Sequence, residues 1–183
     1  MKKKNSVLIS NKIKKFNKII SVEGDKSISH RSLLIASQCI GVSNINNILE
    51  SEDVKNTIIC LKKLGVRIIK KNKKYIVYGN GLGSFKKPKN NFLYAGNSGT
   101  LARMIFALLG TQSNLKVKIS GDNSLNKRDM KRIIDPLTKI GCNFYPKNKT
   151  TLPLTIEGTS MPLAQKHFEK IGSAQVKSAN LLA

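Results

Sequence analysis

The sequence has 183 residues, enough for one domain with a substantial hydrophobic core, and its 33 Lys and Arg against 10 Asp and Glu give a formal net charge of +23. Such a charge suggests nucleic-acid binding, but the lysines are scattered among Asn and Ile, and with 5% aromatic residues and no Trp a base-stacking surface is poorly supplied. We therefore favour composition bias over nucleic-acid binding. No apolar run is long enough to span a membrane, and no apolar segment of a signal peptide follows the basic start.

The cysteines indicate a reducing compartment. Cys39, Cys60 and Cys142 are odd in number and widely spaced, and the two histidines, His30 and His167, are far apart in sequence. This pattern argues against a zinc site or a disulfide framework and predicts a cytoplasmic protein. Cys39 and Cys60 fall within helical apolar patterns, so we expect both in the core.

The stretch from Gly24 to Arg31 is the first candidate binding element. The apolar run 19–22 predicts a strand before it, and residues 27–40 predict a helix that Ser27 caps and Gly41 ends. Free N–H groups at a helix start favour an anion, and Lys26 and Arg31 add full positive charge, so the turn can seat a phosphate or carboxylate. The alternative for a single turn of this kind is a capped helix with two solvated basic residues.

The remaining elements follow the same order twice. The first half also predicts a strand at 7–9, a strand at 42–49, a helix that Ser51 caps and Gly65 ends, and a hairpin of 66–69 with 75–78. The second half predicts a strand at 92–94, a helix at 101–109, a strand at 115–120, a helix at 129–140, and a hairpin of 143–145 with 152–156.

Glycines at matching places reveal an internal repeat. The pairs Gly24 and Gly96, Gly41 and Gly110, Gly65 and Gly141, and Gly79 and Gly158 are 72, 69, 76 and 79 residues apart. Each unit reads strand, helix, strand, helix, strand, strand, which is too long for a thin solenoid. A third copy begins with a strand at 168–171 and a helix that runs to Ala183, so we expect the chain to be a fragment of a longer protein.

Polar turns recur at the predicted helix starts. If they converge, they form a basic cleft rich in hydrogen-bond donors and suited to more than one anionic group. Gly99 would allow close backbone approach to a ligand, whereas Asp25 and Asp122 are expected to fix the backbone of their turns. The cleft candidates are Lys26, Ser27, Arg31, Asn97, Ser98, Gly99, Thr100, Arg103, Lys127, Arg128, Ser173, Ala174, Gln175 and Lys177.

Four motifs in this order resemble the EPSP synthase family. They are Gly24-Asp25-Lys26-Ser27-Ile28-Ser29-His30-Arg31, Gly96-Asn97-Ser98-Gly99-Thr100-Leu101-Ala102-Arg103, Gly121-Asp122-Asn123-Ser124-Leu125-Asn126-Lys127-Arg128 and Ser173-Ala174-Gln175-Val176-Lys177-Ser178-Ala179. The first and last look most like the bacterial variant that is less sensitive to glyphosate. Gly99 matches the glycine whose enlargement impairs glyphosate binding in the family.

The resemblance implies an α/β fold with two domains, each an inside-out α/β barrel of three βαβαββ units. Residues 1–20 would belong with the other, C-terminal domain, and residues 21–183 would form a substrate-binding domain with a truncated third unit. The implied reaction transfers the enolpyruvyl group of phosphoenolpyruvate to the 5-hydroxyl of shikimate 3-phosphate and releases phosphate. It needs no metal or other cofactor. The implied partners are these anionic small molecules, with no nucleic acid, no membrane, and a monomeric full-length protein.

Site residues also follow from the resemblance. Lys26 would contact both substrates and take part in catalysis. The shikimate 3-phosphate site would comprise Lys26, Ser27, Arg31, Ser173, Ala174 and Gln175, and the phosphoenolpyruvate site Lys26, Asn97, Gly99, Arg128 and Gln175.

Two departures and two alternatives accompany this reading. Asp129 stands where the family usually has Pro, and it can either weaken the local positive potential or serve as an early helix residue. The family's acid/base Asp, Glu and Lys lie in the half that this sequence lacks, so we expect the chain alone to be inactive.

The alternatives are a UDP-N-acetylglucosamine enolpyruvyl transferase, whose loop cysteine has no counterpart at Cys39, Cys60 or Cys142, and a basic nucleic-acid-binding protein.

Overall fold

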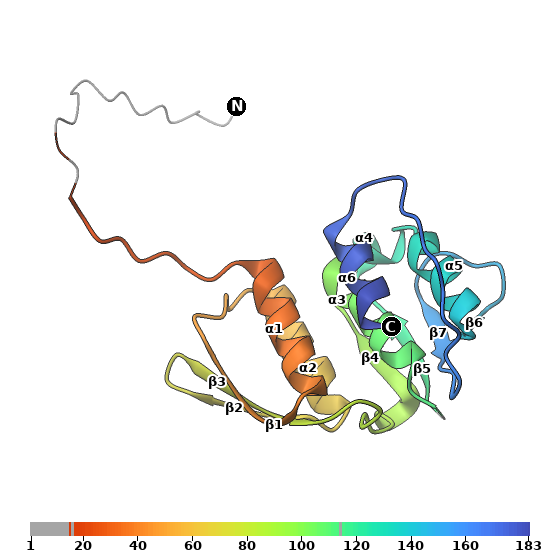
Figure 1. Cartoon of the computed structure of the whole chain (residues 1–183), viewed down its shortest axis with the longest axis horizontal. Helices are drawn as coiled ribbons and strands as arrows, with labels where there is room; N and C mark the ends of the chain where they lie inside the picture. The colour runs from red at the N-terminus through yellow and green to blue at the C-terminus, as the bar shows by residue number, and fades with distance from the viewer. Residues whose placement is uncertain (1–14, 16, 114) are drawn as a thin grey trace.

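The first repeat unit folds as two helices against a three-stranded sheet. In the computed structural model, which describes residues 15, 17–113 and 115–183, helices α1 (Lys26–Gln38) and α2 (Glu52–Lys63) pack against each other. The sheet consists of β1 (Ile40–Asn46), β2 (Arg67–Lys71) and β3 (Lys74–Asn80) in the antiparallel order β1-β3-β2. The two helices lie along one face of this sheet (Figure 1). The strand predicted at 7–9 lies outside the described residues.

The second unit adds a four-stranded sheet and a buried helix. Its strands pair in the order β4-β5-β7-β6, with β4 and β5 parallel and the other pairs antiparallel. The elements, in chain order, are η1 (Lys89–Asn91), β4 (Phe92–Tyr94), α3 (Gly99–Gly110), β5 (Lys116–Ser120), α4 (Asn123–Asn126), α5 (Lys131–Ile140), β6 (Asn143–Tyr145) and β7 (Leu154–Glu157).

The predicted repeat is confirmed in topology. In the second unit the order β4, α3, β5, α5, β6, β7 has the expected pattern, and β5-β7-β6 matches β1-β3-β2 in order and direction. The helix predicted at 129–140 is present as α5 but begins two residues later, because Asp129 forms an isolated antiparallel bridge with Thr151; the short helix α4 precedes it.

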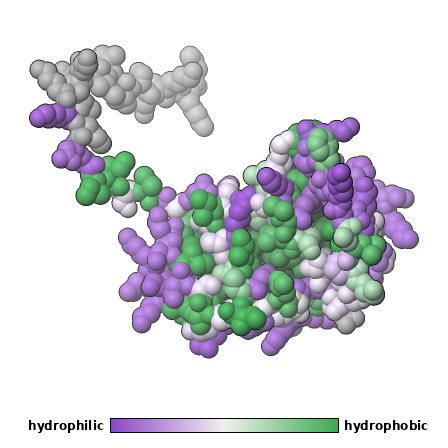
Figure 2. All heavy atoms as spheres, in the orientation of Figure 1, coloured by the Kyte–Doolittle hydropathy of each residue, from purple (hydrophilic) through white to green (hydrophobic). Residues whose placement is uncertain are grey.

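The first strand of the first unit was predicted wrongly. Residues 17–25 contain no strand, and Ile19, Ile20 and Val22 are exposed. Figure 2 shows green, hydrophobic residues along this extended stretch. An apolar run becomes a strand only where a neighbouring strand pairs with it, and among residues 17–113 and 115–183 none does so here. The strand predicted at 168–171 is wrong for the same reason, although the helix after it, α6 (Ala174–Leu182), is present.

The two units share one hydrophobic core with α3 at its centre. Every residue of α3 except Arg103 is buried, as expected for a helix that is apolar on all sides. Helix α6 packs on α3 and α5, while α1 and α2 contact α3 from the first unit. Figure 1 shows α3 and α6 side by side between the two sheets. The helix starts of both units and of α6 are thereby placed around one central element.

Of the two cysteines predicted to lie in the core, one does and one does not. Cys60 is buried, as predicted, and so is Cys142, but Cys39 is exposed. Helix α1 ends at Gln38, two residues before the predicted end, so Cys39 is its C-cap and leaves the apolar face. No helix among residues 17–113 and 115–183 is long and apolar enough to cross a bilayer.

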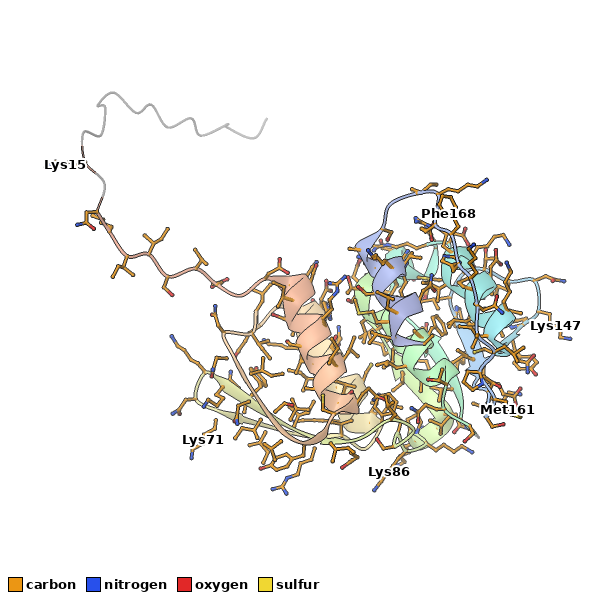
Figure 3. The ribbon with its side chains drawn as sticks, viewed as in Figure 1. Lys15, Lys71, Lys86, Lys147, Met161 and Phe168 are labelled. Carbon is orange, nitrogen blue, oxygen red and sulfur yellow. The ribbon has the colours of Figure 1, made fainter. Side chains whose placement is uncertain are left out.

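The charge is distributed around the periphery. Lys71, Lys86 and Lys147 are exposed, and Figure 3 shows their side chains pointing outward from separate parts of the molecule. Figure 2 shows the hydrophilic residues gathered mainly at the two ends of the folded body. This scattered surface charge is separate from the basic side chains that gather at the helix starts.

Candidate anion-binding site

Helix α1 begins at Lys26, with a different cap from the one predicted. The Asp25 carboxylate accepts a hydrogen bond from the Ile28 N–H at 2.8 Å, so Asp25 and not Ser27 is the N-cap. Both residue types cap helices well, and the backbone leaves the extended conformation directly after Asp25. Lys26 lies in the first turn, and its Nζ is 3.1 Å from an Asp53 carboxylate oxygen. Because half of the Lys26 side chain is exposed, this ion pair is weak and an anionic ligand can compete for the ammonium group.

The start of α3 presents an ordered polar turn. Ser98 caps the helix by accepting a hydrogen bond from the Leu101 N–H at 3.2 Å. Its neighbour Asn97 donates to an Asp122 carboxylate oxygen and accepts from the Arg128 guanidinium, both at 2.6 Å. Asp122 also accepts from the Leu125 N–H at 2.7 Å, and this bond is the main reason that the pKa of its carboxyl is lowered. Asp25 and Asp122 therefore fix the backbone of their turns, as predicted.

Helix α6 carries the third turn to the other two. Ser173 caps α6 by accepting a hydrogen bond from the Val176 N–H at 3.3 Å. Gln175 donates to the Thr100 hydroxyl and accepts from Arg103, both at 2.9 Å. Arg31 donates to the Ser178 hydroxyl at 2.9 Å and to the Ala174 carbonyl at 3.1 Å. These contacts bring together residues up to 147 positions apart in the sequence.

Two guanidinium groups lie over Gly99. A Cβ atom at this position would be 2.6 Å from an Arg103 nitrogen and 3.2 Å from an Arg128 nitrogen. Burial, followed by the positive charges of Arg128 and Arg132, lowers the pKa of Arg103, whereas Asp129 raises it. Like charges held together in a partly buried place attract an anion strongly, because the anion relieves their repulsion.

Arg132 supports this cluster in a way that the sequence did not reveal, and Asp129 takes the helix-start role that was one of its two expectations. Arg132 forms an ion pair with Glu169 at 2.9 Å and donates to the Ile171 carbonyl, which fixes the segment leading to Ser173. Asp129 accepts a hydrogen bond from the Lys131 N–H at 3.0 Å, so it acts as a residue of the helix start. Within the described residues the side chains of Ser27, Lys127 and Lys177 make no hydrogen bond to the protein.

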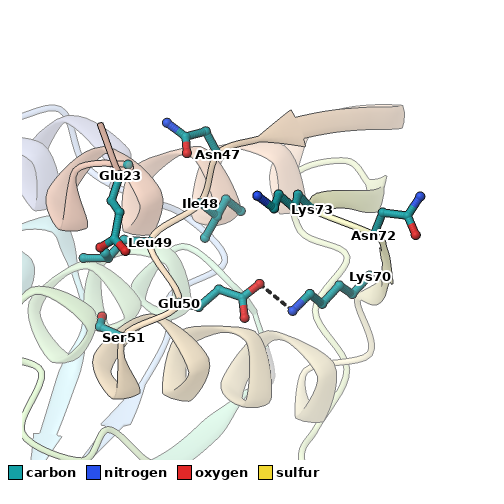
Figure 4. Close-up of a pocket in the computed structure, with 10 residues that line it drawn as sticks. Glu23, Asn47, Ile48, Leu49, Glu50, Ser51, Lys70, Asn72 and Lys73 are labelled. Carbon is teal, nitrogen blue, oxygen red and sulfur yellow. Dashed lines mark ion pairs between the residues drawn. The ribbon is translucent and has the colours of Figure 1, made fainter. Parts of the chain in front are cut away.

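The hollows on the surface only partly coincide with this cluster. A cavity of about 560 Å³ is lined by Ser173, Ala174 and Lys177, among others. A second hollow, of about 610 Å³, lies between the β1–α2 connection and the β2–β3 hairpin, and its lining includes none of the predicted site residues (Figure 4). It contains the ion pair of Glu50 with Lys70. We place the site by the converging turns, since their donors and charges would recognise an anion whether or not a second wall covers them.

Comparisons with known proteins agree with the fold and the motifs. The sequence model of the family EPSP synthase (3-phosphoshikimate 1-carboxyvinyltransferase) matches residues 10–183. The 3-phosphoshikimate 1-carboxyvinyltransferase of Petrotoga mobilis is 45% identical over 171 residues, which cover 91% of this chain and 39% of that protein. The enzyme of the same name from Oenococcus oeni is 44% identical over 163 residues, covering 89% of this chain and 37% of that protein.

A solved structure, EPSP synthase from Acinetobacter baumannii, superimposes with a TM-score of 0.82 at 36% identity and covers 89% of this chain and 37% of that one. The chain therefore spans about two fifths of the length of such relatives. With a family match over residues 10–183 and a fold shared with a solved EPSP synthase at 36% identity, this chain belongs to the EPSP synthase family.

Proposed function

We propose that the protein containing this chain transfers the enolpyruvyl group of phosphoenolpyruvate to the 5-hydroxyl of shikimate 3-phosphate. In this reaction the 5-oxygen forms a bond to the enolpyruvyl carbon, the bond from that carbon to the phosphate oxygen breaks, and the hydroxyl proton is removed. Both substrates carry several negative charges. The convergence of three helix starts with Lys26, Arg31 and Arg128 is the observation that carries this proposal.

The contacts within the chain support a division of this surface into two subsites. Arg31 joins the start of α1 to the start of α6, so these two turns would hold shikimate 3-phosphate. The turn of α3 and Arg128 would hold phosphoenolpyruvate, with Lys26 and Gln175 between the two. The proposed residues are Lys26, Ser27, Arg31, Ser173, Ala174 and Gln175 for shikimate 3-phosphate, and Lys26, Asn97, Gly99, Arg128 and Gln175 for phosphoenolpyruvate.

The second wall of the site is proposed to come from another domain. Residues 21–183 would be the substrate-binding domain, and residues 1–20 would belong with the other domain, which supplies the acid and base. Closure of the two domains would exclude water and strengthen every charge interaction in the site.

The test is a comparison of the complete protein with the 183-residue chain. With both substrates present, the complete protein is expected to release phosphate and form the enolpyruvyl ether, detected by phosphate assay and by mass spectrometry of the product. The isolated chain is expected to form no product, because it lacks the acid and base. Product formation by the isolated chain would contradict the proposed division of labour, and none from the complete protein would overturn the function.

Replacing Gly99 by Ala is expected to weaken phosphoenolpyruvate binding with little loss of stability. The added Cβ must displace the Arg103 and Arg128 guanidinium groups, which are ends of flexible side chains. Losing the alignment of one charged hydrogen bond costs about 2 kcal/mol, or about thirtyfold in affinity. Steady-state kinetics of the complete protein should show a raised KM for phosphoenolpyruvate. Gly172→Ala is the control, since nothing lies within 4 Å of its Cβ position, and an unchanged KM in Gly99→Ala would contradict the arrangement.

A further inference from the structure

A buried histidine stands between the first two anion-binding turns. His30 has no exposed surface, and both of its ring nitrogens have partners. Nδ1 is 2.6 Å from the Thr57 hydroxyl of α2, and Nε2 is 3.3 Å from the hydroxyl of Ser98, the N-cap of α3. One imidazole on α1 therefore joins α1, α2 and α3 through side chains alone.

The hydrogen bonds around His30 favour one position for its proton. The Thr57 hydroxyl lies 3.4 Å from the Asp53 carbonyl and can donate to it, which leaves the hydroxyl oxygen to accept from His30. The Ser98 oxygen already accepts from the Leu101 N–H, and its own proton is free for His30 Nε2. In the assignment that agrees with these contacts, the proton is on Nδ1 and the Ser98 hydroxyl donates to Nε2. The Nδ1–H and the hydroxyl protons of Thr57 and Ser98 then each have an acceptor.

Each end of this series of hydrogen bonds reaches a residue that adjoins the proposed site. Asp53, whose carbonyl receives the Thr57 proton, carries the carboxylate that pairs with Lys26 at 3.1 Å. Ser98 lies between Asn97 and Gly99, which belong to the proposed phosphoenolpyruvate subsite. His30 is thus connected to both turns from a fully buried position.

We propose that His30 is a positioning residue that sets the distance between Lys26 and the Asn97–Gly99 turn through a neutral imidazole protonated at Nδ1. The proposal rests on the function proposed above and concerns its geometry. When this link is broken, each substrate still binds its charged partners, but the two substrates are held at the wrong distance from each other. A misplacement of about 1 Å at a reacting centre can cost about a hundredfold in rate.

The surroundings keep the imidazole neutral. The pKa of His30 is lowered to about 4, chiefly because the ring is buried; the Asp53 carboxylate opposes this shift, and the charges of Lys26 and Arg31 add to it. A second proton would place a donor on Nε2, facing a hydroxyl whose own proton would then lack its acceptor. The ring therefore stays neutral across the neutral pH range.

The first measurement is spectroscopic and does not depend on activity. In ¹⁵N-histidine-labelled complete protein, the ring signals that disappear in His30→Asn belong to His30. They are expected to show long-range couplings of an imidazole protonated at Nδ1 alone from pH 8 down to pH 5. Signals of the Nε2-protonated tautomer, or of a doubly protonated ring in this range, would overturn the assignment.

The second measurement separates positioning from stability. His30→Asn places an amide donor near the Nδ1 position but loses the acceptor for Ser98, and it is expected to lower kcat about tenfold or more while the Kd for shikimate 3-phosphate alone changes less than about threefold. Thr57→Val in the His30→Asn background should add little further loss of kcat, because both changes break the same link.

Ser37→Ala is the matched control. Ser37 is also fully buried on α1 and donates to the Leu34 carbonyl, but it has no connection to the anion-binding turns. Its replacement should lower the melting temperature and leave kcat unchanged. A His30→Asn protein with unchanged kcat would overturn the positioning role. A wild-type protein without enolpyruvyl transfer would overturn the proposed function, and with it the kinetic role of His30, while the imidazole signals would still confirm or refute the link.

Discussion

Replacing Lys26 by Met in the complete protein is expected to lower kcat/KM by about a thousandfold, or about 4 kcal/mol, with almost no change in melting temperature. Lys26 is proposed to contact both substrates, and each charge-assisted hydrogen bond contributes about 1.5–3 kcal/mol. The protein itself loses only the ion pair with Asp53, in which half of the lysine side chain is exposed, and such pairs contribute at most about 1 kcal/mol.

Steady-state kinetics with each substrate varied in turn provide the measurement. The control is Lys55→Met. Lys55 is an exposed lysine of α2, and its replacement changes the net charge by the same amount away from the site. A Lys26→Met protein that keeps more than about a tenth of its kcat/KM would refute the proposed contact with both substrates. Equal losses in the two variants would show that only the overall charge of the protein matters.

Gly79→Ala and Gly158→Ala are each expected to destabilise the protein by about 3 kcal/mol or more. These glycines correspond in the repeat. A Cβ on Gly79 would be 2.2 Å from the Cys39 carbonyl oxygen and 2.3 Å from that of Ala36, and one on Gly158 would be 2.2 Å from the Gln112 carbonyl oxygen and 2.4 Å from that of Leu109. In both units the end of the last strand lies against the carbonyl groups at the end of the first helix. Because these are backbone atoms, they cannot move aside as the end of a flexible side chain can.

Urea unfolding followed by circular dichroism tests this expectation through the shift in midpoint. Gly172→Ala is again the matched control, because its Cβ would meet nothing within 4 Å, and it should shift stability by less than about 0.5 kcal/mol. Losses below about 1 kcal/mol at both Gly79 and Gly158 would mean that the close approach of strand and helix relaxes easily.

Local signals in the sequence were sufficient for most of the fold. The β2–β3 hairpin, strand β4 and helix α3 follow from apolar periodicity bounded by glycines, and these features act within a few residues of chain. The spacing of matching glycines also revealed the repeat, because the same strand-to-helix crossing is built twice. One error occurred where the outcome depends on a distant partner, because none of the described strands lies beside residues 19–22. The other was an error in a helix boundary, since Cys39 lies just past the end of α1.

The candidate site shows the same division. The sequence by itself determined the polar turns, the roles of Asp25 and Asp122 in fixing the backbone of those turns, and the kind of ligand that such turns attract, but it named the wrong cap for α1. Only the tertiary structure decided that the turns meet, through Arg31 with α6 and Gln175 with Thr100, and that His30, Asp53 and Arg132 support them. Caps and turns arise from neighbouring residues, whereas these contacts join positions as many as 147 residues apart and exist only once helices α1, α3 and α6 have packed together.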